Sequence, residues 1–176
     1  WARYRQWILH YARLAELNGS ALFVVGTELG GTTAPEQGQE QAWRRIIADV
    51  RRVYHGPLTY AAHWGREFQT LPFWDALDFL GVNFYYPLAS EQDGRTPSAA
   101  VAERVAQTIE QVQRRWNKPV LFTEVGFPSA GSAAREPWKE NPSDTADPAQ
   151  QALCYQVVFR AFYHRTWLVG VYWWKW

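Results

Sequence analysis

The sequence predicts an α/β fold in which helices and strands alternate along a single domain. Three observations support this prediction. The chain contains five short apolar runs rich in β-branched and aromatic residues. Stretches with helical periodicity, bounded by capping signals, separate these runs. The length of 176 residues is enough to bury one sizeable core, so we expect one domain over residues 1–176.

The apolar runs are the expected strands, and they lie at 21–28, 58–64, 79–86, 119–124 and 169–174. A helix is expected before the first strand and between successive strands. This alternation favours parallel strands with right-handed crossovers.

The first expected helix covers residues 2–18 and ends at the cap signal Asn18-Gly19. A Gly/Thr-rich loop follows the first strand. The next helix carries an i, i+3, i+4, i+7 apolar stripe from Trp43 to Tyr54 and stops at His55-Gly56-Pro57. A short helical piece around 71–78 precedes the third strand.

Two longer helices are expected in the second half of the chain. Pro97-Ser98 opens a helix with one apolar face that runs to Trp116. Asp147-Pro148 is a good N-cap and first-turn pair for a helix reaching about His164. The loop of about twenty residues before Asp147 is long enough for a functional role to be expected.

Both a doubly wound sheet and part of a (β/α)8 TIM barrel fit this alternation. No Gly-rich phosphate turn follows any strand, which counts against a nucleotide-binding doubly wound fold. A complete barrel usually takes about 250 residues, and this chain has no initiator Met and no helix after its final strand. We therefore expect the C-terminal part of a barrel, about strands four to eight. The flanks of strands 21–28 and 169–174 would then be unpaired.

Composition excludes several classes of partner. The net charge is +1 and the basic residues are spread along helices, so no nucleic-acid partner is expected. No apolar stretch approaches the roughly 18 residues of a membrane span. The four histidines lack metal-ligand spacing, so we expect neither a metal nor a cofactor. The single cysteine, Cys154, is expected to be buried, and the compartment stays open because a signal peptide could have been lost.

Two glutamates close apolar strands, and they are the most informative residues in the chain. Glu28 ends the first strand and Glu124 ends the fourth, each preceded by a threonine and followed by a Gly-containing turn. Both runs are typical of buried parallel strands, where a carboxylate is costly unless it lies at the mouth of the sheet. Two carboxylates at the C-terminal ends of barrel strands can face each other across a sugar, as glycoside hydrolysis requires. The alternative is a structural role, in which both glutamates cap their strands through salt bridges.

Aromatic content is high, with 11 Trp, 9 Tyr and 9 Phe. Some of these residues must fill the core. Others can offer flat faces to a pyranose ring, and composition alone does not separate the two uses.

The motifs together resemble family 113 of the glycoside hydrolases, typified by β-mannanases, within the retaining barrel clan. The resemblance covers nearly the whole chain. Its blocks lie at residues 26–29, 58–64, 73–75, 80–87, 118–126 and 172–176. The fourth and seventh barrel strands carry the acid/base and the nucleophile in that clan, which would be the strands ending at Glu28 and Glu124.

The resemblance implies a role for each matching residue. Glu28 would be the general acid/base, and Glu124 the nucleophile that forms a covalent glycosyl-enzyme. The two carboxyl groups would then lie roughly 5–5.5 Å apart. Many clan members have Asn before the acid/base, where it binds the sugar 2-hydroxyl, whereas this chain has Thr27.

Further residues are implied at the substrate site. Tyr85 matches the clan tyrosine that orients the nucleophile, and Asn83 shares its face of the strand by alternation. Asn83 is equally well explained as a buried amide bonded to neighbouring strands. Trp174 matches the platform beneath the cleaved sugar, with Trp176 further out on the same face. The remaining candidates for substrate contacts are Trp64 and Trp138.

The expected activity is retaining hydrolysis of β-1,4-linked mannan or manno-oligosaccharides, with an oligosaccharide or polysaccharide as the partner. Two alternatives within the sugar class stay open, a non-catalytic carbohydrate-binding barrel and a glycosidase for another β-glycan. A Schiff-base aldolase would need a desolvated lysine inside the barrel. The chain offers only Lys118 before its strand, Lys139 in a loop and Lys175, which by parity points away from the Trp174 face.

Overall fold

The computed structural model describes residues 1–139 and 144–174. Five parallel strands form one sheet in the order β1-β2-β3-β4-β5. Their bounds are β1 Phe23–Thr27, β2 Leu58–His63, β3 Leu80–Phe84, β4 Val120–Val125 and β5 Leu168–Trp173. The expected strands and their parallel alternation with helices are therefore confirmed, and the fold is a partial barrel. Lys175 and Trp176 lie outside the described residues.

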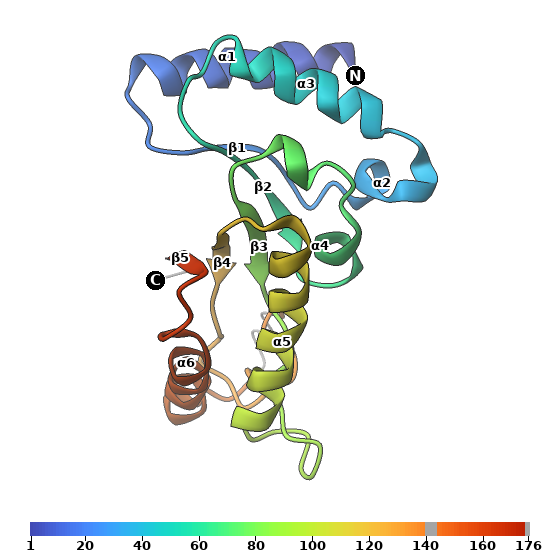
Figure 1. Ribbon diagram of the computed structural model, residues 1–176. Coiled ribbons are helices and arrows are strands. Elements are labelled where there is room, and N and C mark those ends of the chain that lie inside the picture. The colour runs from blue at the N-terminus through green and yellow to red at the C-terminus, as the bar shows by residue number, and fades with distance from the viewer. Residues whose placement is uncertain (140–143, 175–176) are drawn as a thin grey trace.

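The helices connect successive strands and lie against one another in pairs. Helix α1 contacts α3, and α5 contacts α6, with the strands between the two pairs (Figure 1). The α-helices are α1 Ala2–Leu17, α2 Gly30–Thr33, α3 Glu40–Arg51, α4 Arg66–Thr70, α5 Ala99–Trp116 and α6 Pro148–Phe162. Two 3-10 turns, η1 Pro35–Gln37 and η2 Trp74–Ala76, complete the list.

The predicted capping residues begin helices α5 and α6. The Ser98 side chain accepts a hydrogen bond from the Val101 amide at the start of α5. The Asp147 carboxylate accepts one from the Gln150 amide, at 2.9 Å, at the start of α6. Both bonds satisfy an amide that the helix leaves free in its first turn.

The core lies between the sheet and its helices. Trp43 of α3 stacks on Phe73 and meets Tyr60 of β2 edge-on. Phe84 and Phe122 pack together against Phe162 of α6. Cys154 is fully buried on α6, as the sequence predicts. Many of the aromatic residues therefore fill the core.

The edge strands differ from the interior ones in burial. Only Val25 is buried in β1, whereas β3 is buried throughout. The expectation of a buried strand at 21–28 is therefore wrong, because β1 has a neighbour on one side only. β5 is the other edge and is also half-exposed. Such open edges are typical of part of a barrel.

Local structure also departs from the sequence prediction in three places. The short helical piece expected around 71–78 is a 3-10 turn at Trp74–Ala76, and a separate short helix, α4, precedes it. The Gly/Thr loop after β1 contains the one-turn helix α2. Helices this short have no apolar stripe to detect, so periodicity does not reveal them.

No helix in the described parts of the chain is long and apolar enough to cross a membrane.

Candidate active site

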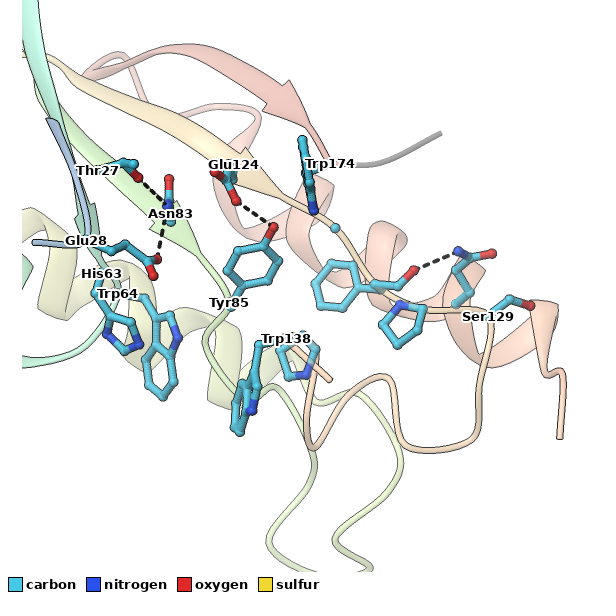
Figure 2. A pocket seen from close by; sticks show the side chains of 15 residues that line it. Thr27, Glu28, His63, Trp64, Asn83, Tyr85, Glu124, Ser129, Trp138 and Trp174 are labelled. Carbon is cyan, nitrogen blue, oxygen red and sulfur yellow. Dashed lines mark hydrogen bonds between the residues drawn. The ribbon is translucent and has the colours of Figure 1, made fainter. Parts of the chain in front are cut away.

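A cavity of about 730 Å³ opens at the carboxyl ends of the strands. Its walls come from all five strand ends and from the loop after β4 (Figure 2). Each candidate predicted from the sequence lines this cavity: Glu28, Trp64, Asn83, Tyr85, Glu124, Trp138 and Trp174. The described lining residues include two carboxylates and no lysine or arginine, which disfavours the alternative in which the glutamates only cap strands through salt bridges.

Glu28 lies directly after β1 in an unusual backbone conformation. Its φ is 47°, in the left-handed region that non-glycine residues rarely adopt. Its amide donates to the Ala61 carbonyl at 2.9 Å. The carboxylate is exposed to the cavity and accepts a hydrogen bond from Asn83 Nδ2 at 3.0 Å.

Glu124 lies within β4 and is half-buried. Its Oε2 accepts a hydrogen bond from the Tyr85 hydroxyl at 2.9 Å. The sheet register shifts between Val82 and Asn83, so that Val82 faces Phe122 and Asn83 faces Glu124. This bulge leaves Thr123 without a partner in the register and changes the direction of the strand end.

Strand alternation is broken beside both glutamates. Side chains of successive strand residues normally point to opposite faces. The Asn83 amide nevertheless reaches both Thr27 Oγ1, at 3.4 Å, and Glu28 Oε1. Its Oδ1 accepts from Thr123 Oγ1 at 2.8 Å, although Thr123 is the neighbour of Glu124. Thr27 and Glu28 thus both line the cavity, with Glu28 in the left-handed conformation. Beside the bulge, Thr123 bonds to the lining residue Asn83, and Glu124 lines the cavity itself.

Asn83 is 2% exposed and uses both ends of its amide. It links β1, β3 and β4 beneath the cavity. This geometry matches the interpretation of a buried amide bonded to neighbouring strands, and it adds a direct contact with Glu28. Asn83 and Tyr85 point to the same face, as alternation predicts (Figure 2).

The aromatic candidates form two walls. Trp64 stacks on Trp138 with ring centroids 5.4 Å apart, although Trp64 directly follows β2 and Trp138 belongs to the loop after β4. Trp174 lies at the opposite wall and is half-exposed, while its neighbour Trp173 packs on Tyr155 and Phe159 of α6. The exposed rings therefore flank the glutamates on both sides (Figure 2).

Sequence reasoning missed some lining residues. His63 ends β2 on the cavity side and stacks on Trp64 at 5.0 Å. Strand alternation from Thr59 through Ala61 predicts that face, so this residue could have been found. Gln151 donates from Nε2 to the Phe127 carbonyl and thereby ties the loop after β4 to α6. No sequence pattern identifies that contact.

The chemistry of other barrel enzymes finds little support in the described residues. Lys118 lies at the opposite end of the strands, where its amine donates to the carbonyls of Asp75 and Leu77. Lys139 is exposed and pairs with Glu136. Lys175 lies outside the described residues. Within residues 1–139 and 144–174, no group of His, Cys, Asp and Glu side chains could hold a metal ion.

The chain is similar to solved glycosidase structures. It superposes on a GH113 β-1,4-mannanase with a TM-score of 0.84 and 32% sequence identity, covering 98% of this chain and 51% of that one. It also superposes on the GH113 β-mannanase AaManA from Alicyclobacillus acidocaldarius, determined in complex with ManMIm. There the TM-score is 0.83 and the identity 29%, over 98% of this chain and 50% of the other. The chain thus spans about half the length of these mannanases.

More distant likeness extends to other glycosidases. The β-glucuronidase of Faecalibacterium prausnitzii matches 99% of this chain and 28% of its own length, with a TM-score of 0.69 and 18% identity. At that identity the likeness concerns the fold alone. No curated protein sequence matches the chain. The sequence profile of Glycoside Hydrolase Family 113 matches residues 1–176, so the chain belongs to that family.

Proposed function

We propose that residues 1–176 form the C-terminal portion of a retaining glycoside hydrolase barrel that cleaves β-1,4-linked mannan or manno-oligosaccharides. The observation that carries the proposal is the pair of glutamates facing one cavity, with Glu28 bonded to Asn83 of β3 and Glu124 to Tyr85 just after β3. Membership of family 113 and the two mannanase neighbours support the substrate class.

In the first chemical step, Glu124 attacks the anomeric carbon while the bond to the glycosidic oxygen breaks. Glu28 donates its proton to that oxygen, so the leaving oligosaccharide departs as a neutral alcohol. The cleaved sugar remains as an ester on Glu124. The Tyr85 hydroxyl donates to Glu124 Oε2, which supports attack through the other carboxylate oxygen.

In the second step, Glu28 removes a proton from water as the water oxygen attacks the anomeric carbon. The ester bond to Glu124 breaks, and both glutamates return to their starting protonation states. Two displacements at one carbon retain its configuration. Asn83 orients Glu28 for both steps, since its Nδ2 donates to a Glu28 carboxylate oxygen.

The exposed rings account for sugar binding in this proposal. Trp174 offers a half-exposed face beside Glu124 for the sugar that is cleaved. Trp64 and Trp138 line the Glu28 side of the cavity and would contact a neighbouring sugar. Thr27 stands where many relatives of the clan carry Asn, and its hydroxyl lines the same cavity. We expect this shorter side chain to contribute a polar contact to the substrate.

Proton NMR of β-1,4-mannopentaose hydrolysis tests the proposal. The complete barrel that contains residues 1–176 is used, as wild type and as Glu124→Gln. We expect the β-anomer of the product to appear first with wild type and no product with the variant. An α-anomer appearing first would contradict the retaining mechanism.

Absence of cleavage by the wild type would contradict the mannanase assignment. Glucan and xylan oligomers would then distinguish another β-glycan glycosidase from a non-catalytic carbohydrate-binding barrel. Binding without turnover of any oligomer would favour the second.

A further inference from the structure

Another carboxylate, Glu67, lies behind the strands, on the helix side of β2. It belongs to the short helix α4 and does not line the cavity. Three donors converge on it. Its Oε1 accepts from the Tyr60 hydroxyl at 2.8 Å and from Thr33 Oγ1, and its Oε2 accepts from the His63 amide at 2.7 Å. Tyr60 and Thr33 are 0% and 2% exposed, whereas Glu67 itself is half-buried.

Tyr60 connects Glu67 to the backbone beside Glu28. Its oxygen accepts a hydrogen bond from the Leu29 amide at 2.6 Å. A phenol has one proton, and an amide can only donate, so the Tyr60 proton must point to Glu67. Burial, and after it the charge of Glu67, raise the pKa of Tyr60 well above its usual range, which keeps this proton in place.

The Leu29 amide belongs to the peptide group that follows Glu28. Glu28 has the left-handed φ of 47°, a conformation that persists only when its surroundings hold it. The amide before it is bonded to the Ala61 carbonyl, and the amide after it to Tyr60. Both bonds come from β2. The direction of the Glu28 side chain is therefore fixed from behind the cavity as well as by Asn83.

Glu67 also bonds to the end of β2, which forms the neighbouring wall of the cavity. The His63 amide, which donates to Glu67, carries the first of two consecutive lining residues, His63 and Trp64. Glu67 thus joins the turn that carries Glu28 to the end of β2.

We propose that Glu67, acting through Tyr60, is a positioning residue that sets the direction of Glu28 for proton transfer. The inference rests on the proposed function of Glu28 as acid/base. Glu67 touches neither substrate nor reacting atoms, so its effect should appear only where acid assistance is needed.

The test uses Glu67→Gln and Tyr60→Phe in the complete barrel, with two substrates. Mannopentaose has a sugar leaving group that must be protonated, whereas 2,4-dinitrophenyl β-mannobioside has a leaving group that needs no proton. We expect kcat/KM on mannopentaose to fall about tenfold or more in both variants, which lies within the general-acid contribution. With the dinitrophenyl substrate, kcat/KM should stay near the wild-type value, since it reports only steps up to leaving-group departure.

Each variant has a defined physical effect. The amide of Glu67→Gln presents an NH2 group to one of three converging donors, so at least one hydrogen bond is lost in either orientation. Tyr60→Phe keeps the ring packing against Trp43 and removes only the hydroxyl. If Glu67→Gln fails to fold, Tyr60→Phe still tests the connection.

Tyr54→Phe is the matched control. Tyr54 is 1% exposed, and its hydroxyl donates to the Ser20 carbonyl, 2.6 Å away, before the start of β1. This variant should lower the melting temperature to an extent similar to Tyr60→Phe but leave the ratio of the two kcat/KM values unchanged.

Two results would overturn the proposal. An equal loss of kcat/KM on both substrates, or no loss on either, would show that Glu67 only stabilises the fold. If wild type cleaved neither substrate, the proposed function would fail, and the role of Glu67 would fail with it. The wild-type arm therefore separates the two failures.

Discussion

The two glutamates reach the same cavity from different structural settings. Glu28 follows an edge strand in which only Val25 is buried, and its carboxylate is exposed. Glu124 lies inside β4, whose first three residues are buried, and is itself half-buried. Glu28 is held by its left-handed backbone, two flanking amide bonds and Asn83. Glu124 is held by its strand, a bulge and the Tyr85 hydroxyl.

This difference shows that two carboxylates at one cavity can be oriented by different sets of local contacts. The interior strand β4 is constrained by β3 and β5, so a single phenol completes its orientation. Within the described residues β1 pairs with β2, and hydrogen bonds from β2 and β3 hold the turn that carries Glu28.

The largest expected effect separates the two roles. Glu124→Gln should lower kcat on the order of 10⁶-fold, the scale seen when a hydrolase loses its nucleophile. Glu28→Gln should lower kcat/KM on mannopentaose by about 10²- to 10⁴-fold, and much less on a dinitrophenyl mannobioside. Steady-state kinetics on both substrates checks this. Equal activity of Glu124→Gln and Glu28→Gln on the dinitrophenyl substrate would contradict the assignment of different roles to the two glutamates.

Strand β3, which carries Asn83 and leads to Tyr85, has no room for a side chain at Gly81. A Cβ at Gly81 in β3 would lie 2.4 Å from the Tyr60 carbonyl oxygen and 2.7 Å from Thr59 Oγ1. Because one of these atoms is backbone, β2 and β3 would have to separate. We expect Gly81→Ala to lower the free energy of unfolding by about 3 kcal/mol or more, measured by urea denaturation.

Gly131→Ala is a control for that variant, since its nearest neighbour is the terminal Arg95 Nη2, at 3.1 Å. A flexible arginine end can move, so little loss is expected there. Equal losses in the two variants would contradict the argument from backbone overlap.

Removing the Tyr85 hydroxyl tests whether Glu124 depends on one bond. A hydrogen bond to a charged group contributes about 1.5–3 kcal/mol, so Tyr85→Phe should lower kcat roughly 10- to 100-fold. The melting temperature should change little because Tyr85 is only half-buried. An unchanged kcat would mean that the β4 bulge alone orients Glu124.

The smallest effect concerns the closed core behind β4. Burial raises the pKa of Cys154 to about 12, which leaves very little thiolate at neutral pH. Iodoacetamide should therefore alkylate the native protein very slowly and the urea-unfolded protein rapidly, as mass spectrometry would show. Raising the pH toward 12 should increase the native rate, because the thiolate fraction rises. Rapid alkylation of Cys154 in the native protein would mean that the core around α6 opens as readily as the half-exposed strands β1 and β5.

Much of the architecture could be predicted from the sequence, because its signals are local. Apolar runs mark the strands, and Ser98 and Asp147 begin their helices as their residue types favour. Alternation correctly assigns Asn83 and Tyr85 to one face. The candidate side chains meet because the carboxyl ends of parallel strands share one edge of the sheet.

The remainder depends on contacts between distant segments. Nothing in the stretch around Glu67 indicates that it bonds to Tyr60 and, through it, supports Leu29. The left-handed conformation of Glu28 is likewise unpredictable, since glycine and asparagine are the usual residues there. The Val82/Asn83 bulge leaves no mark in the pattern, although it decides where Glu124 points.

The left-handed backbone of Glu28 also has a consequence for laboratory evolution. A non-glycine residue in this conformation costs roughly 1–2 kcal/mol, a strain that Glu28→Gly would relieve. A screen that rewards heat resistance alone would thus favour loss of the proposed acid/base, and thermostabilised variants should be selected with turnover as a second criterion. The same variant, with its side chain removed and its fold relaxed, is a natural starting point for enzymes that transfer sugars to strong external nucleophiles such as azide or thiols.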